Sequence, residues 1–240
     1  MCTVTYLPVA NGFVLTHNRD EAPTRSPQII SREKRFGTEI LFPKDTKAGG
    51  AWIATTRDGR TACLLNGAFE KHKHQPPYRL SRGQVLLDFF SWPQPRLFFE
   101  QYALEEIEPF TFLFFLPGEV VEFRWDGHTR HLKNLPPGQA HFWCSATLYP
   151  PPMQERRERV FRDWLAKQNQ ERPRLASQIF TLHLTGSVGD PENDYVMNRA
   201  GRVCTVSVTQ IVLQNGRVRM RYTDLLDAKQ DRKRMRLLTG

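Results

Sequence analysis

The second residue of the chain, Cys2, carries both groups that an N-terminal nucleophile needs. Initiator methionine is usually removed when the next side chain is small, so we expect Met1 to be trimmed and Cys2 to become the first residue. A free α-amine has a pKa of about 7.7–8.0, so a good fraction of it is a neutral base near pH 7. It can take the proton of the thiol and later deliver it to a leaving group. On position alone, a thiol that begins an edge strand is the simpler interpretation of Cys2.

A charged segment, residues 18–21 (Asn-Arg-Asp-Glu), gives this cysteine potential partners. Residues 3–16 predict a short hairpin with an Asn-Gly turn, and its far end returns toward the start of the chain. Arg19 would then favour the Cys2 thiolate, and the carboxylate of Asp20 would orient the α-amine. The alternative interpretation of the segment is a solvated charged turn.

Local patterns predict the elements that position these residues. Apolar alternation and Asn-Gly or Asp-Gly turns predict strands at residues 3–7, 12–16, 51–56, 61–66, 110–116, 120–125, 140–145, 203–213 and 217–222. Helical spacing of apolar residues predicts helices after the N-cap Ser81 and at residues 96–106, 153–168 and 175–184. Residues 18–48 are interpreted as a long polar excursion, and residues 229–236 as a basic, solvated helix.

Hairpins dominate this order of elements, and no strand–helix–strand alternation is visible. The pattern therefore favours an α+β fold with antiparallel sheets over a doubly wound parallel sheet. We expect a single domain over residues 1–240.

Several motifs occur together in a fixed order along the first third of the chain. They are Met1-Cys2, Asn18-Arg19-Asp20-Glu21, Arg25 with Pro27, Gly49-Gly50-Ala51-Trp52, Gly59-Arg60 followed by Asn66, and Ser81-Arg82-Gly83. This ordered set resembles the NRDE or TANGO2-like (transport and Golgi organisation 2) family over roughly residues 1–90.

The resemblance implies an N-terminal-nucleophile (Ntn) hydrolase-like fold, a four-layer αββα sandwich of two antiparallel sheets between helices. Similar amidases, of the penicillin V acylase and bile salt hydrolase group, use an N-terminal Cys followed by Arg and Asp. The implied activity is hydrolysis of a non-peptide amide C–N bond in a small molecule. The implied catalytic residues are Cys2, Arg19, Asp20 and Asn66, with the Asn66 amide at the oxyanion.

Three further residues are expected to contact the ligand: Asn18, Glu21 and Trp52. Trp52 fits a core position as well as a ligand platform. The amidases also carry a second active-site Asn and a late Arg. Here the chain reads Cys144-Ser145-Ala146, and the late Arg is Arg202, Arg219 or Arg221. The alternative function is therefore a non-catalytic binding or trafficking protein for a haem, acyl or lipid ligand on the same scaffold.

Metal and nucleic-acid chemistry are weaker interpretations. His72 and His74, with Cys63 near them in the sequence, fit a zinc or nickel site. A Pro- and Lys-rich loop is more often a solvated surface, so we expect no metal or cofactor. The basic residues 156–162 and 229–236 lack interleaved aromatic residues, so we expect no nucleic-acid partner. Solvation is the simplest explanation of these faces, and an anionic lipid or acidic ligand comes second.

The composition bounds these hypotheses. With 40% hydrophobic and 25% charged residues, the chain is globular rather than disordered or fibrous. No apolar run reaches the length of a membrane helix, and no secretory signal is visible. Four cysteines without a CxxC motif favour a reducing cytoplasm. The net charge of +9 permits an acidic partner, and a soluble basic protein without such a partner is the simpler interpretation. The expected partner is an unidentified small molecule.

Overall fold

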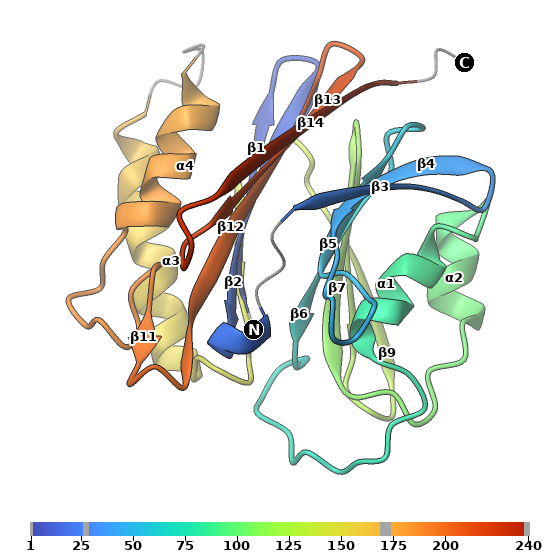
Figure 1. The fold of residues 1–240 in the computed structure, drawn as a ribbon, viewed down its shortest axis with the longest axis horizontal. Coiled ribbons are helices and arrows are strands. Elements are labelled where there is room, and N and C mark those ends of the chain that lie inside the picture. The colour runs from blue at the N-terminus through green and yellow to red at the C-terminus, as the bar shows by residue number, and fades with distance from the viewer. Residues whose placement is uncertain (1, 26–28, 169–173, 238–240) are drawn as a thin grey trace.

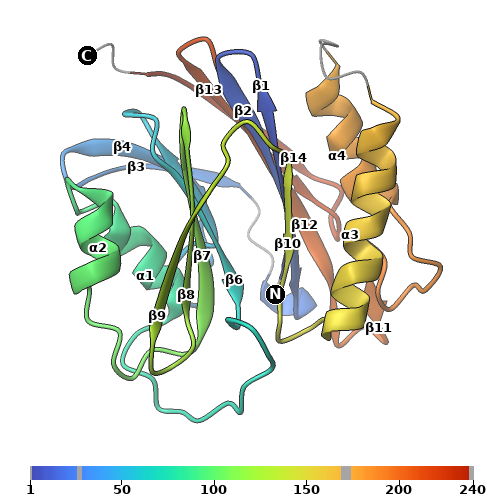
Figure 2. The same ribbon diagram turned by 180° about the vertical axis from the view of Figure 1, so that it is seen from behind.

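The computed structural model describes residues 2–25, 29–168 and 174–237, which form four layers. Figure 1 shows two β-sheets face to face, with α3 and α4 against one sheet and α1 and α2 against the other. Figure 2 shows the same order of layers from behind. This confirms the α+β, αββα arrangement expected from the sequence.

The first sheet is antiparallel throughout and has the strand order β10-β1-β2-β12-β13-β14, with β11 paired to β12. Its strands are β1 (Cys2–Val9), β2 (Gly12–Glu21), β10 (His141–Cys144), β11 (Asn198–Arg199), β12 (Val203–Gln214), β13 (Arg217–Asp224) and β14 (Gln230–Arg236). Two segments far apart in the chain, β2 and β12, thus lie side by side at its centre.

The second sheet is an antiparallel meander in which every strand pairs with its neighbour in sequence. Its strands are β3 (Ile30–Arg35), β4 (Thr38–Pro43), β5 (Ile53–Thr56), β6 (Thr61–Asn66), β7 (Phe110–Leu116), β8 (Glu119–Trp125) and β9 (Arg130–Leu135). A single 3-10 turn, η1 (Pro23–Arg25), follows β2 on the path into this sheet.

Apolar side chains fill the space between the layers. The inner faces of the two sheets share one core, which includes Tyr6, Phe13 and Phe115. Phenylalanines dominate the outer face of the second sheet, under α1 (Arg82–Phe89) and α2 (Pro95–Gln101). The helices α3 (Pro151–Ala166) and α4 (Leu175–Thr185) bury a third cluster on the first sheet. No helix in the described ranges is long and apolar enough to cross a membrane.

Turn chemistry accounts for the hairpins. Asn11 and the pair Asn215-Gly216 have positive φ angles of 57°, 51° and 68°, which Asn and Gly tolerate best. Ser81 accepts a hydrogen bond from the backbone N–H of Gln84 at 3.2 Å, which confirms the predicted N-cap of α1.

Two expectations about local structure were wrong. The excursion at residues 18–48 contains β3 and β4, and the tail 229–236 is β14 rather than a helix. The strand β9, at residues 130–135, was absent from the predicted elements. In β3, β9 and β14 most side chains are charged or polar, and all but Ile30 and Met235 are at least partly exposed, because these strands lie at sheet edges. A helix predicted over residues 96–106 is also shorter, ending at Gln101.

Candidate active site

The hairpin of β1 and β2 sets Cys2 directly opposite Arg19. Cross-strand partners project from the same face of a sheet, so both side chains point toward the second sheet. Cys2 is almost completely buried, with 2% of its surface exposed. The proximity expected from the short hairpin is therefore present in the backbone register.

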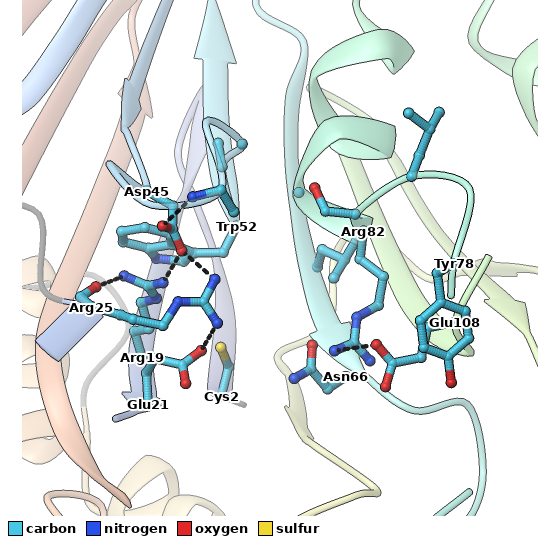
Figure 3. Close-up of a pocket in the computed structure, with 17 residues that line it drawn as sticks. Cys2, Arg19, Glu21, Arg25, Asp45, Trp52, Asn66, Tyr78, Arg82 and Glu108 are labelled. Atoms are coloured by element: carbon cyan, nitrogen blue, oxygen red, sulfur yellow. Dashed lines mark hydrogen bonds and ion pairs between the residues drawn. The ribbon is translucent and has the colours of Figure 1, made fainter. Parts of the chain in front are cut away.

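A pocket of about 390 Å³ opens at this end of the two sheets. Figure 3 shows Cys2 and Arg19 on one side of it and Asn66 and Arg82 on the other. The lining contains three arginines and three carboxylates: Arg19, Arg25, Arg82, Glu21, Asp45 and Glu108. The pocket thus lies between the two sheets, and its lining mixes these charged side chains with apolar ones such as Trp52 and Leu64.

Arg19 is held rigidly in the pocket wall. Its guanidinium donates to Asp45 Oδ2 at 2.6 Å and to the carbonyl oxygen of Arg25 at 2.6 Å. The same guanidinium stacks over the Trp52 ring, 3.9 Å from its centroid. A delocalised planar cation suits this combination of a carboxylate and an aromatic face. Trp52 accordingly serves both as a core residue and as part of the pocket lining.

Asp45 is the acidic centre of this wall. It accepts hydrogen bonds from the backbone N–H groups of Lys47 and Ala48, both at 3.0 Å, and from Arg25 at 2.7 Å. Burial raises the pKa of Asp45, but these hydrogen bonds and Arg19 outweigh it and hold the pKa below its ordinary value. The carboxylate is therefore ionised at neutral pH and joins both arginines.

The ionisation of Cys2 differs from the simplest expectation. Burial raises the pKa of the Cys2 thiol, and the Asp20 carboxylate raises it further. The Arg19 guanidinium lowers this pKa, as expected, but does not offset the other effects. Since the ordinary pKa of a thiol is about 8.5, the thiol is mostly protonated near pH 7. A nearby base is needed to activate it.

Asp20 lies behind the strand rather than in the pocket. It is fully buried, and its carboxylate accepts hydrogen bonds from Tyr149 at 2.9 Å and Thr205 at 2.7 Å. Burial raises the pKa of Asp20, whereas the Arg157 guanidinium lowers it. Because Asp20 also raises the pKa of the Cys2 thiol, it acts on the site electrostatically from the opposite face.

Asn18 does not line the pocket either. Its side-chain amide donates to the carbonyl oxygens of His183 at 2.9 Å and Tyr195 at 2.7 Å. These contacts join β2 to α4 and to the loop before β11. Asn18 therefore has no contact with the pocket and serves the packing of the first sheet against its helices.

Asn66 lies at the end of β6 and lines the pocket, as does Glu21 at the end of β2. The backbone oxygen of Asn66 accepts a hydrogen bond from Ser145 at 2.8 Å. No hydrogen bond joins its side-chain amide to another residue in the described part of the chain. The Asn66 amide is thus available to a ligand in the pocket.

The match to known sequences decides the family. A family model described as Transport and Golgi organisation 2 matches residues 1–222. The chain belongs to this family. A search of curated proteins gave no match.

Solved structures show which fold this Transport and Golgi organisation 2 protein adopts. A mutant of the conjugated bile acid hydrolase from Clostridium perfringens aligns with a TM-score of 0.59 and 11% identity, covering 98% of this chain and 92% of that one. An arginine-to-leucine variant of the same enzyme gives 0.56 and 11%, with 95% and 92% covered. The Caenorhabditis elegans N-acylethanolamine-hydrolyzing acid amidase ortholog gives 0.51 and 13%, with 88% and 92% covered. The shared architecture is the Ntn-hydrolase fold.

Several lining residues of this Transport and Golgi organisation 2 protein were missing from the sequence-based site. The guanidinium Nη2 of Arg82 forms an ion pair with Glu108 Oε2 at 3.0 Å. In Figure 3 this pair lies across the pocket from Cys2, with Tyr78 beside it. The available signal was the Ser-Arg-Gly motif at residues 81–83. Nothing local marked Asp45 or Glu108, because each comes from a loop that reaches the pocket only through tertiary packing.

Arg202, Arg219 and Arg221, the candidates for a late arginine, are all absent from the pocket lining. Arg221 instead packs over Phe180 of α4, 3.8 Å from the ring centroid. The positive charge near Cys2 comes from Arg19, Arg25 and Arg82, which all lie within residues 1–90.

His72 and His74 lie beside the pocket, with ring nitrogens 3.0 Å and 3.2 Å from Glu108 Oε1. No group of three or more metal-ligating side chains exists within the described ranges. The two histidines thus contact the Arg82–Glu108 pair at the rim.

Close packing of two glycines shapes the wall next to Arg82. A Cβ atom on Gly50 would come within 2.6 Å of the backbone of Gly83. The backbone N–H of Ala51 donates to the carbonyl oxygen of Gly83 at 3.1 Å. Only glycine allows the first turn of α1 to approach the Gly-Gly-Ala-Trp segment this closely.

Proposed function

We propose that this protein is an N-terminal-cysteine hydrolase that cleaves a non-peptide amide C–N bond in a small molecule. The observation that carries the proposal is the position of Cys2 in the wall of a pocket, with Arg19 beside it and the Asn66 amide across from it. The names of the structural relatives, a conjugated bile acid hydrolase and an N-acylethanolamine-hydrolyzing amidase, support the same class of reaction.

The proposed reaction needs Cys2 to be the first residue, with Met1, which lies outside the described residues, removed. The α-amine takes the proton of the thiol, which the raised thiol pKa makes necessary. The thiolate attacks the amide carbonyl carbon, and the Asn66 amide donates a hydrogen bond to the developing oxyanion. The C–N bond breaks, the leaving amine receives the proton, and a thioester remains on Cys2. Water then hydrolyses the thioester and releases the carboxylic acid.

In this proposal Arg19 and Asp20 have different tasks. Arg19 lines the pocket and stabilises negative charge on the sulfur, because its guanidinium lowers the pKa of the Cys2 thiol. Asp20 is a positioning residue, whose buried carboxylate holds the protonated amine from behind the strand. Tyr149 and Thr205 fix that carboxylate by hydrogen bonds.

The pocket favours a small amide that carries both polar and apolar groups. Its volume of about 390 Å³ is near the lower end of the range for small-molecule sites, roughly 300–1,000 Å³. Arg82 and Glu21 present charges on opposite sides of the opening, and Trp52 adds an aromatic surface. We propose that these residues contact the parts of the substrate outside the amide.

The four cysteines are unpaired, which supports a cytoplasmic location.

The intact mass of the purified protein tests the proposal. We expect the mass of the chain without Met1, because the small side chain at position 2 permits its removal. A Cys2→Glu variant, whose larger side chain blocks removal, provides the mass of the untrimmed form. A wild-type protein that keeps Met1 would lack the α-amine on Cys2, and the proposed mechanism would be wrong. A carrier of a haem, acyl or lipid ligand needs no such trimming.

A further inference from the structure

Six arginines project from one face of the β13–β14 hairpin, at the edge of the first sheet. The register pairs Arg217 with Arg236, Arg219 with Arg234, and Arg221 with Arg232. The residues that alternate with them on β13, Val218, Met220 and Tyr222, are buried in the core. We call the six residues the arginine ladder. The ladder is not predicted from the sequence alone, in which residues 229–236 are interpreted as a helix. Only the pairing of β13 with β14 brings the arginines of the two segments together.

The ladder places like charges directly opposite each other. Cross-strand partners have Cβ atoms about 4.5–5.5 Å apart, and like charges at that separation are destabilising. Within the described ranges, no ion pair joins a ladder arginine to a carboxylate. The nearby Asp231 and Asp227 pair with Lys233 at 3.5 Å and Lys229 at 3.1 Å instead. No carboxylate of the described residues therefore compensates this repulsion, although Arg221 stacks over Phe180.

Four ladder residues line a groove of about 620 Å³ at the turn between β12 and β13. They are Arg217, Arg219, Arg234 and Arg236, and the lining includes no carboxylate and no aromatic side chain. The distance between this groove and the Cys2 pocket follows from their positions along β2. Gln214, in the groove lining, pairs with Gly12 at the start of β2, and Arg19, in the Cys2 pocket, lies seven residues further along the same strand. At about 3.3 Å per residue, the groove is roughly 23 Å from the Cys2 pocket. It is a separate site.

We propose that the arginine ladder binds a ligand that carries two or more phosphate groups. Guanidinium groups bind phosphate oxygens in a bidentate manner, and each of the two opposed pairs in the groove, Arg217–Arg236 and Arg219–Arg234, offers two of them to one phosphate. The next pair is two residues along the strand, about 6.7 Å away, which suits a second phosphate of the same ligand. Single-stranded nucleic acid is less suitable, since its binding relies on bases stacked on aromatic side chains, which the groove lacks.

Calorimetric titration with inorganic tripolyphosphate at about 0.15 M ionic strength tests the proposal. We expect saturable binding to the wild type and at least a tenfold weaker affinity for the Arg219→Gln/Arg234→Gln variant. The control is Arg159→Gln/Arg202→Gln, which removes the same charge from two exposed positions outside the ladder. Its affinity should stay within twofold of the wild type. The ladder variant should unfold at a temperature at least as high as the wild type, because it relieves repulsion.

A second experiment identifies the source of the phosphates. Phosphatidylcholine vesicles with and without phosphatidylinositol bisphosphate are sedimented with the protein. Binding that needs the phosphoinositide and is displaced by tripolyphosphate identifies a lipid headgroup. Tripolyphosphate binding without vesicle binding identifies a free polyphosphate. The proposal is wrong if neither probe binds, if both double variants lose affinity equally, or if a single-stranded oligonucleotide binds the groove while tripolyphosphate fails to compete.

Discussion

A Cys2→Ala variant is expected to lose amide hydrolysis by roughly 10⁴-fold or more, because the substitution removes the proposed nucleophile and leaves only binding and oxyanion stabilisation. The assay measures primary amine released from a panel of N-acyl amino acids and other small N-acyl amines. Substrate binding should survive, since the pocket wall formed by Arg19, Trp52 and Arg82 stays in place.

Cys144→Ala is the matched control for this experiment. Cys144 pairs with Thr3 on the neighbouring strand and is absent from the Cys2 pocket lining. Its substitution should leave turnover within about twofold of the wild type. Equal losses in both variants would contradict a special role for Cys2, and full turnover in Cys2→Ala would exclude it as the nucleophile.

An Asp45→Asn variant is expected to lose about 3–5 kcal/mol of unfolding free energy at pH 7. The carboxylate pairs with Arg19 at 2.6 Å, and the two side chains are only 7% and 5% exposed. Removing one partner of a buried ion pair leaves the other charge uncompensated, and this produces losses of that size. Arg25 loses its contact with Asp45 in the same variant but keeps its ion pair with Glu21. Urea unfolding of the purified protein measures the change.

The pH dependence gives this prediction a second readout. The pKa of Asp45 is lower in the folded protein than its ordinary value. Its contribution to stability is therefore complete above the unfolded pKa, about 3.9, and is lost as the pH falls through the folded pKa. The difference between wild type and Asp45→Asn should shrink below about pH 4. Asp227→Asn, which breaks the exposed pair with Lys229, should cost at most about 1 kcal/mol at any pH.

Local sequence signals predicted most of the fold. Asn-Gly and Asp-Gly turns identified the hairpins β1–β2, β5–β6 and β12–β13, and apolar spacing identified α3 and α4. The strands β3, β9 and β14 were missed because their charged residues resemble loops or solvated helices. Only the pairing of a distant strand makes such segments extended. These three edge strands therefore required the structure, whereas the edge strand β10 was predicted from its sequence.

The residues of the candidate site also fall into those that the sequence predicted and those that it did not. The predicted hairpin at residues 3–16 correctly placed Arg19 next to Cys2. Because side chains alternate between the two faces of a strand, Asn18 and Asp20 lie on the opposite face from Arg19. Applying that period to residues 18–21 would have placed Asn18 and Asp20 on the helix side, away from the pocket. Asp45 and Glu108 had no comparable signal. Their contact with the site depends on where two loops pack, which no local pattern encodes.

The most direct test of the central claim is to acid-quench the wild-type protein during turnover of an N-acyl amine and to locate the acyl group by peptide mass mapping. The proposed mechanism predicts an acyl thioester on a peptide that begins with Cys2 and lacks Met1. An acyl group on Cys63, Cys144 or Cys204 would contradict it. Turnover with no acyl adduct on Cys2 would also contradict it.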